Sequence, residues 1–301
     1  MRRVLVLGAP SSLGISPYDD GGARRLDLAP DAFRARDIVQ RVHGEDGGDV
    51  TPRDEYRDFV RPERDCRNED LVDTYSRELA SVLVPAFTDD VFVLLLGGDC
   101  SILLGALYGL HASGSEAHGL VYIDGHADFA TLDESPSHSP CSMNLAIATG
   151  RARPARLGFD LDETLVHGPR VVHLGRKDDH QPEYGFRSLP EFGVLDIPNH
   201  IIATDGPQRA GARALDRVGQ LDDGFWIHLD ADVLDPLLMP AVDSPVPGGL
   251  DLNECIQLLR PLVRHPGARG LQLTIYDPSI DVDGNGAELL TLLVQRALGA
   301  A

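Results

Sequence analysis

The chain is short of lysine and strongly biased toward acidic residues. Lys177 is the only lysine among 27 basic residues, whereas Asp and Glu together number 47, which gives a formal net charge of -20. Nucleic acids and anionic membranes are bound through basic patches, so we expect neither as a partner. An acidic surface keeps a protein soluble, and carboxylates retained for cations would add to the same excess.

Cysteines and long apolar runs are also scarce. The four cysteines, Cys66, Cys100, Cys141 and Cys255, are widely spaced and form no CxxC pair, which favours a reducing compartment over a disulfide framework. No stretch approaches the roughly 20 consecutive apolar residues of a membrane span. The opening residues Met-Arg-Arg-Val-Leu-Val-Leu-Gly indicate a short strand and not a signal peptide. We therefore expect a cytoplasmic protein.

Short apolar segments alternate with segments of helical periodicity. Strands are expected at residues 3–8, 91–96, 119–124, 170–175, 200–203, 226–230 and 270–276. Helices are expected at residues 27–42, from 68 or 70 to 83, and at 102–110, 206–218, 252–263 and 287–298. Unalternating apolar strands separated by helices are typical of a parallel sheet covered on both faces. The pattern predicts one three-layer α/β/α domain over residues 1–301, with a central, mostly parallel sheet; the polar residues 43–68 resist interpretation.

Two of the expected strands end in potential metal ligands. Asp124, His126 and Asp128 follow the run Val-Tyr-Ile at alternating positions, so their side chains can share one face. Asp230 and Asp232 follow Trp-Ile-His-Leu in the same way. Either strand end alone is more simply a turn into a polar loop. In a parallel sheet, however, both lie in the crevice at the carboxyl ends, where four carboxylates would repel one another unless cations lay between them.

Four motifs in order resemble the ureohydrolase (arginase/agmatinase) family. They are Gly97-Gly-Asp-Cys-Ser101, Asp124-Gly-His-Ala-Asp128, His228-Leu-Asp-Ala-Asp-Val-Leu-Asp-Pro236 and Ser244-Pro-Val-Pro-Gly-Gly-Leu250. The resemblance implies an arginase-like fold, a binuclear manganese centre, hydrolysis of a guanidinium or related C–N bond, and assembly into homotrimers or homohexamers. By position, Asp124 and Asp230 would bridge two metals. Asp128 and Cys100 would complete the first site, and His126 with Asp232 the second.

This ligand set has its own chemical logic. Hard oxygen ligands with a nitrogen donor suit Mn(II), and two divalent ions lower the pKa of a shared water toward neutrality. Asp128 could also orient that water. Cys100 departs from the pattern, because the family usually has His there. A thiolate would shift the preference toward Zn, Fe or Co; alternatively, Cys100 is a buried non-ligand and only one metal is retained.

Other departures concern the proton shuttle and the substrate. Ser139-Pro-Cys141 aligns with the segment where arginases place a shuttling His, so that role would pass to Cys141 or to nearby His138. Ile275 stands where the family has the Glu that grips the guanidinium, and Ala130 where arginases have an Asn against the substrate's amino-acid end. Asp178 would face the substrate amino group or cap the next segment.

These departures make ordinary arginase activity doubtful, because Ile cannot offset a buried guanidinium charge. The motifs also resemble those of the Nω-hydroxy-L-arginine amidinohydrolase of D-cycloserine biosynthesis, whose hydroxyguanidine substrate is less basic than a guanidine and so depends less on a carboxylate partner. We expect a binuclear metallohydrolase acting on a guanidino or hydroxyguanidino small molecule. The alternatives are a hydrolase of a neutral amide or formimino substrate, and an inactive protein of the same fold with a structural or regulatory role. Tyr122, His173 and His228 lie inside apolar runs and are expected to be satisfied core residues.

Overall fold

A computed structural model describes residues 2–57, 66–115, 117–157 and 164–299. The strands are β1 Arg3–Ala9, β2 Glu45–Asp49, β3 Val91–Gly97, β4 Gly119–Ile123, β5 Val171–Leu174, β6 Leu195–Ile197, β7 Phe225–Asp230 and β8 Ala268–Thr274. The α-helices are α1 Ala29–Arg34, α2 Ile38–Arg41, α3 Glu69–Leu83, α4 Ile102–Ala112, α5 Asn144–Ala148, α6 Asn199–Asp205, α7 Pro207–Val218, α8 Leu252–Arg264 and α9 Asn285–Leu298.

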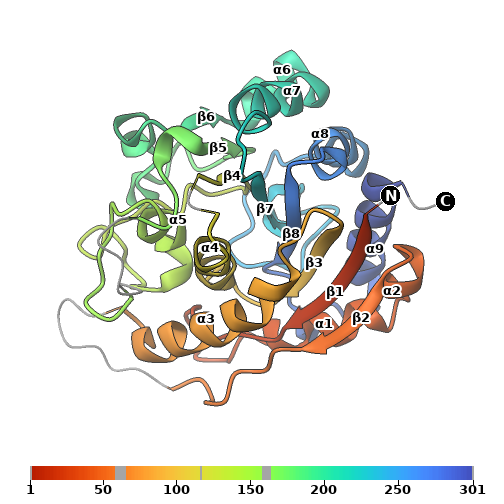
Figure 1. The fold of residues 1–301 in the computed structure, drawn as a ribbon. Coiled ribbons are helices and arrows are strands. Elements are labelled where there is room, and N and C mark those ends of the chain that lie inside the picture. Colours follow the sequence, from red (N-terminus) through yellow and green to blue (C-terminus); the bar gives the residue numbers. More distant parts are fainter. Residues whose placement is uncertain (1, 58–65, 116, 158–163, 300–301) are drawn as a thin grey trace.

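The strands form one sheet in the order β2-β1-β3-β8-β7-β4-β5-β6, and each neighbouring pair is parallel. Helices cover both faces, with α3, α4 and α5 on one side and α7, α8 and α9 on the other (Figure 1). The predicted three-layer α/β/α fold is confirmed.

Alternate residues of the central strands supply the two cores. Phe92, Leu94 and Leu96 of β3 point to one face, and Val93 and Leu95 point to the other, all of them buried. A strand buried on both faces has no polar alternation, which is why its sequence is a continuous apolar run.

One predicted strand is wrong. Residues 200–203 lie in α6, whose first turn is closed by hydrogen bonds from Ile201 N and Ile202 N to Pro198 O. The strand is instead Leu195–Ile197, just before Pro198. A short apolar run cannot by itself distinguish a strand from a helical turn.

Two other segments differ from expectation in detail. The helix expected at 27–42 is divided into α1 and α2, because Asp37 adopts a left-handed conformation with φ of 58°. The uninterpreted stretch 43–68 contains β2, an edge strand built from Glu45-Asp-Gly-Gly-Asp49. Residues 58–65 of that stretch lie outside the described residues. β2 carries no apolar residue, so no strand pattern was available in its sequence.

The sheet order places the predicted motifs side by side. β3, β8, β7 and β4 are consecutive in the sheet, although all three of their junctions join strands that are far apart in sequence or in reverse order. Their carboxyl ends lead into Cys100, Ile275, Asp230 and Asp124 respectively. The predicted ligands therefore meet at one edge of the sheet.

Candidate metal centre

The loop after β3 is held close to the loop after β1. Gly98 passes Ser11 so closely that a Cβ at position 98 would lie 2.0 Å from Ser11 O, so only glycine fits. Asp99 accepts hydrogen bonds from Ser11 Oγ (3.0 Å), Gly14 N (3.1 Å) and Ser101 N (2.9 Å). These contacts fix the backbone on both sides of Cys100.

Cys100 is buried beside one of the predicted bridging carboxylates. Its Sγ lies 2.8 Å from Asp230 Oδ2, and Thr274 Oγ1 approaches the same oxygen at 3.4 Å. Burial, the neighbouring Cys141 and the Asp230 charge raise the pKa of the Cys100 thiol well above its usual value. Without a cation the thiol therefore stays protonated and donates to Asp230.

Asp124 and His126 come from the loop that leaves β4. Asp124 Oδ1 accepts from His126 N (2.7 Å), and the His126 ring contacts Tyr184 with centroids 4.8 Å apart. His126 Nδ1 lies 2.8 Å from Asp232 Oδ2. Burial opposes protonation of His126, but the Asp232 charge and hydrogen bond outweigh it and raise the pKa of His126 to about 10.

Asp230 and Asp232 come from β7 and the short 3-10 helix that follows it. Asp230 Oδ1 accepts from Asp232 N (2.8 Å), and Asp232 Oδ1 accepts from Gly125 N (2.9 Å). Lys177 Nζ donates to the carbonyls of Asp232 (2.8 Å) and Val246 (2.6 Å). The chain's only lysine thus anchors the loop that carries Asp232.

Asp128 is held by two side chains that sequence patterns did not identify. Its Oδ2 accepts from Tyr122 OH (2.8 Å) and from Asn144 Nδ2 (2.9 Å). Asp128 has a left-handed backbone, with φ of 46°. Tyr122 was expected to be only a core residue, because a Tyr inside an apolar run gives no sign of where its hydroxyl ends.

The ligand atoms form two groups compatible with a pair of cations. Cys100, Asp124, His228 and Asp230 make one group, and Asp124, His126 and Asp232 the other, with the atoms of each group within 4.8 Å of one another. Asp124 belongs to both groups. Asp128 lies outside both but lines the same cavity.

The electrostatics of the cluster fit bound cations. Burial first, and neighbouring carboxylates second, raise the pKa of Asp124, Asp128 and Asp230 well above the usual value for Asp. Asp124 Oδ2 and His126 Nε2 are buried with no hydrogen-bond partner among the described residues. Unpartnered buried polar atoms of this kind are costly. Divalent cations would satisfy both of them, with His126 losing its proton as the metal binds.

A cavity of about 200 Å³ opens above these residues. Besides the candidate ligands, its walls include Ile15, Ser16, Pro17, Asp19, Arg24, Ser137, Ser139, Cys141, Ser142, Tyr184, Asp243, Ser244 and Ile275. Three residues that line the cavity have a left-handed backbone conformation: Asp128, Ser244 (φ 48°) and Ile275 (φ 67°). Ile is β-branched and rarely adopts this conformation, and strained residues of this kind cluster at functional sites.

Of the two predicted proton-shuttle residues, Cys141 lines the cavity, whereas His138, on the same loop, is not among the described wall residues. Cys141 lines the cavity, with its Sγ 3.4 Å from Asp99 Oδ1, and burial raises the pKa of its thiol to about 12. His138 adopts a left-handed backbone with φ of 52°, and the described cavity wall contains its neighbours Ser137 and Ser139.

Of the three predicted substrate contacts, Ile275 lines the cavity, whereas Asp178 and Ala130 are not among its described wall residues. Ile275 is a wall residue held by a hydrogen bond from its N to Gly98 O (2.9 Å). Asp178 is fully buried, and its two oxygens accept from Arg176 Nη1 (2.9 Å) and Ala127 N (2.9 Å). Ala130 is also fully buried, and neither Asp178 nor Ala130 is among the described wall residues.

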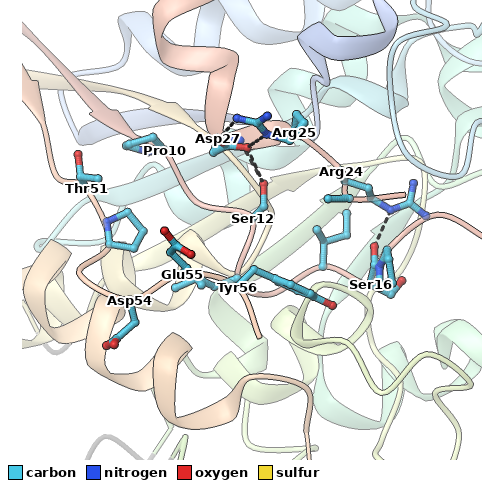
Figure 2. Close-up of a pocket in the computed structure, with 15 residues that line it drawn as sticks. Pro10, Ser12, Ser16, Arg24, Arg25, Asp27, Thr51, Asp54, Glu55 and Tyr56 are labelled. Atoms are coloured by element: carbon cyan, nitrogen blue, oxygen red, sulfur yellow. Dashed lines mark hydrogen bonds and ion pairs between the residues drawn. The ribbon is translucent and has the colours of Figure 1, made fainter. Parts of the chain in front are cut away.

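Arg24 and Asp243 form a charged pair at the side of the cavity. Arg24 Nη1 lies 2.5 Å from Asp243 Oδ1, and its guanidinium stacks over Tyr18 at 4.1 Å. Figure 2 shows Arg24 bonded through Nε to Ser16 O (2.7 Å), at the edge of a neighbouring cavity of about 390 Å³. The two cavities share Ile15, Ser16, Pro17 and Arg24.

Comparison with known proteins agrees with these observations. The model of the arginase family matches residues 2–299. The chain is 27% identical to an arginase of Bacillus subtilis over 289 residues, covering 94% of this chain and 95% of that one. It is 26% identical to an arginase of Bacillus caldovelox over 304 residues, covering 99% of each.

Solved structures give the same result. The arginase of Bacillus caldovelox superposes with a TM-score of 0.86 at 26% identity, covering 100% of this chain and 99% of that one. The proclavaminate amidino hydrolase of Streptomyces clavuligerus has the same fold, with a TM-score of 0.71 at 20% identity and coverage of 99% and 92%. Among the described residues, no helix combines the length and apolar character needed to cross a membrane.

Proposed function

Because this chain belongs to the arginase family, whose members are hydrolases of C–N bonds that depend on a binuclear metal centre, we propose that it hydrolyses a C–N bond of an uncharged guanidino compound. A hydroxyguanidine is much less basic than a guanidine, so it can be bound in its neutral form at little cost. Arginine, whose guanidinium stays charged, is expected to be a poor substrate. Manganese is the proposed metal, with zinc, iron or cobalt favoured to the extent that Cys100 acts as a ligand.

One observation carries the proposal: Ile275 occupies the wall position where the family resemblance leads us to expect Glu. Apart from the candidate ligands, the described wall contains two acids. Asp243 is already paired with Arg24, and Asp19 is exposed to solvent, so neither replaces that Glu as a buried partner for a guanidinium. An arginine guanidinium would thus be desolvated beside a cation without a counter-charge, which is strongly unfavourable.

The residues that line the cavity supply the remaining chemistry. When bound, the two metal ions would be held by Asp124, Asp230, Asp232, His126 and Cys100, and would supply an activated water nucleophile. Asp128, which the family resemblance also makes a ligand, lies outside both groups of ligand atoms, and we assign it to proton transfer. Asp128 is held through Oδ2 by Tyr122 and Asn144, which leaves Oδ1 to take a proton and deliver it to the leaving amine nitrogen. Burial, together with the neighbouring Asp124 charge, raises the pKa of Asp128, which favours uptake of a proton by its carboxylate.

A panel of substrates tests the proposal. Metal-loaded protein would be assayed with hydroxyarginine, arginine, agmatine and formiminoglutamate. Hydroxyurea is the expected product of hydroxyarginine, urea that of arginine and agmatine, and formamide or ammonia that of formiminoglutamate, and each would be measured separately. We expect hydroxyarginine to be cleaved with a kcat/KM at least about a hundredfold above that of arginine, since about 3 kcal/mol is lost when a buried charge has no partner. Asp230→Asn is the matched inactive control.

The other outcomes are equally informative. Turnover of arginine or agmatine as fast as hydroxyarginine would refute the proposal. Turnover of formiminoglutamate alone would support the second candidate, a hydrolase of a neutral formimino or amide group, which Ile275 also favours. Metal-loaded protein that cleaves none of the four compounds would point to a non-catalytic descendant with a structural or regulatory role.

A further inference from the structure

A row of buried polar side chains crosses the sheet two residues before the candidate ligands Asp124 and Asp230. Tyr122 of β4 pairs in register with His228 of β7, and His228 with Gln272 of β8. All three are fully buried. Side chains two positions apart on a strand share a face, so His228 lies directly beneath Asp230 and Tyr122 beneath Asp124.

The Tyr122 part of this row already supports a candidate catalytic group. Its hydroxyl donates to Asp128, and its ring stacks on the His228 imidazole with centroids 4.3 Å apart and an interplanar angle of 11°. The stacking fixes the plane of the His228 ring. His228 was expected to be a satisfied core residue, but its Nε2 has no hydrogen-bond partner among the described residues.

Hydrogen-bond chemistry determines which nitrogen of His228 carries the proton. Trp226 Nε1 lies 2.7 Å from the Gln272 amide, and an indole N–H is a donor only, so Gln272 must present Oε1 to it. The Gln272 NH₂ group then faces His228 Nδ1 at 2.7 Å. Nδ1 must therefore accept, which leaves the proton on Nε2. The opposite tautomer would turn the Gln272 NH₂ group against the Trp226 N–H.

The protonated Nε2 faces a candidate bridging carboxylate. His228 Nε2 lies 3.5 Å from Asp124 Oδ2, and that oxygen also has no hydrogen-bond partner among the described residues. Contacts of this length in ligand-free sites commonly shorten when the site is filled. The same nitrogen lies in the group with Cys100 and Asp230, so it is also close enough to be considered as a metal ligand.

We propose that His228 is a positioning residue and not a metal ligand: its Nε2–H donates to Asp124 Oδ2 and holds that carboxylate in its bridging orientation, with Trp226 and Gln272 locking the tautomer. The proposal rests on the metal centre of the proposed function but not on the substrate. The lock is a property of the protein alone, so it can be tested even if the proposed reaction fails.

Nitrogen NMR of protein labelled with ¹⁵N-histidine tests the lock directly. The His228 signals are assigned by their loss in His228→Gln. In metal-free protein we expect Nε2 to be protonated and Nδ1 to be an unprotonated acceptor. On addition of Zn²⁺ alone, which is diamagnetic, the Nε2–H should remain. Loss of that proton on Zn²⁺ binding, or a proton on Nδ1 in the metal-free protein, would overturn the proposal.

Metal affinity separates positioning from a purely structural role. His228→Leu removes the donor, and we expect its Zn²⁺ and Mn²⁺ affinities, measured by calorimetry, to fall about 10- to 100-fold, as is usual when the partner of a metal ligand is lost. His228→Gln keeps an N–H at the end of the side chain and should recover most of that loss. Unchanged affinity in a folded His228→Leu variant would overturn the proposal.

A second variant covers the case in which His228→Leu does not fold. Gln272→Glu places acceptors toward both Trp226 and His228, so the tautomer lock predicts that a proton moves onto Nδ1. The same NMR experiment reads this shift. If Nδ1 stays unprotonated in Gln272→Glu, the lock is not as described and the proposal fails.

Discussion

Introducing a carboxylate at position 275 should raise the activity toward arginine. Ile275→Glu places an acid on the wall where the guanidinium of a substrate would lie. Breaking a buried ion pair by removing one partner costs about 3–5 kcal/mol. Supplying the missing partner should recover part of this, and a gain of about 3 kcal/mol corresponds to roughly a hundredfold rise in kcat/KM for arginine.

The same substitution should lower the stability of the substrate-free protein. Ile275 is only 3% exposed, so loss of its burial costs about 1.5–3 kcal/mol. The new carboxylate also lacks a partner until substrate binds. Partly offsetting this, Glu is not β-branched and tolerates φ of 67° better than Ile. We therefore expect a lower Tm together with a changed specificity.

The assay is the ratio of kcat/KM for arginine to kcat/KM for hydroxyarginine, measured in wild type, Ile275→Glu and Ile275→Gln. The Gln variant has nearly the same shape as Glu without its charge, so it controls for packing. The ratio should rise in Glu and not in Gln. If the two variants give the same ratio, the missing carboxylate does not set the specificity and the reasoning is refuted.

Three further predictions concern pH, a buried ion pair and metal preference. In metal-free protein, the pKa of His126 is raised from 6.5 to about 10, so the stability that its charge contributes is present below pH 6.5 and is lost as pH rises toward 10. Tm should therefore fall as pH rises from 6 to 10, and a Tm that rises over this range in a thermal scan would contradict that sign. Asp178→Asn removes one of three carboxylates that pair with Arg176 and should lower stability by about 1.5–3 kcal/mol, yet leave KM unchanged, as measured by denaturant unfolding and steady-state kinetics. A raised KM with intact stability would instead support a direct substrate contact. Cys100→Ser keeps a donor to Asp230 but removes the soft ligand, so calorimetry should show a larger loss of affinity for Zn²⁺ than for Mn²⁺, and equal losses would indicate that the thiol is not a ligand.

Most of the fold could be predicted from the sequence, because parallel strands buried on both faces are continuous apolar runs. β3 is apolar throughout, and β7 is buried throughout and mainly apolar; such runs between helical segments predict a parallel sheet with few alternatives. β2 was not predictable, since an exposed edge strand of Glu, Asp and Gly has no apolar pattern. The mistaken strand at 200–203 failed for the opposite reason: an apolar run of one helical turn fits either structure.

The clustering of the candidate ligands was also predictable, because each lies at or shortly after the end of a strand and has a chemically distinctive side chain. The residues that support them were not. Tyr122, His228 and Gln272 lie inside apolar strands, and only the register of β4, β7 and β8 brings them into one row. Arg24 and Asp243 are far apart in sequence, and nothing in either segment indicates that they meet.

The metal count of the purified protein tests the central claim most directly. Equilibrium dialysis against Mn²⁺, followed by elemental analysis, should give two equivalents per chain for wild type and at most one for Asp230→Asn, with Asp205→Asn, an exposed carboxylate at the end of α6, as the matched control at two. Wild-type protein that binds no metal, or that binds equally with and without Asp230, would contradict the assignment of these carboxylates to a metal centre.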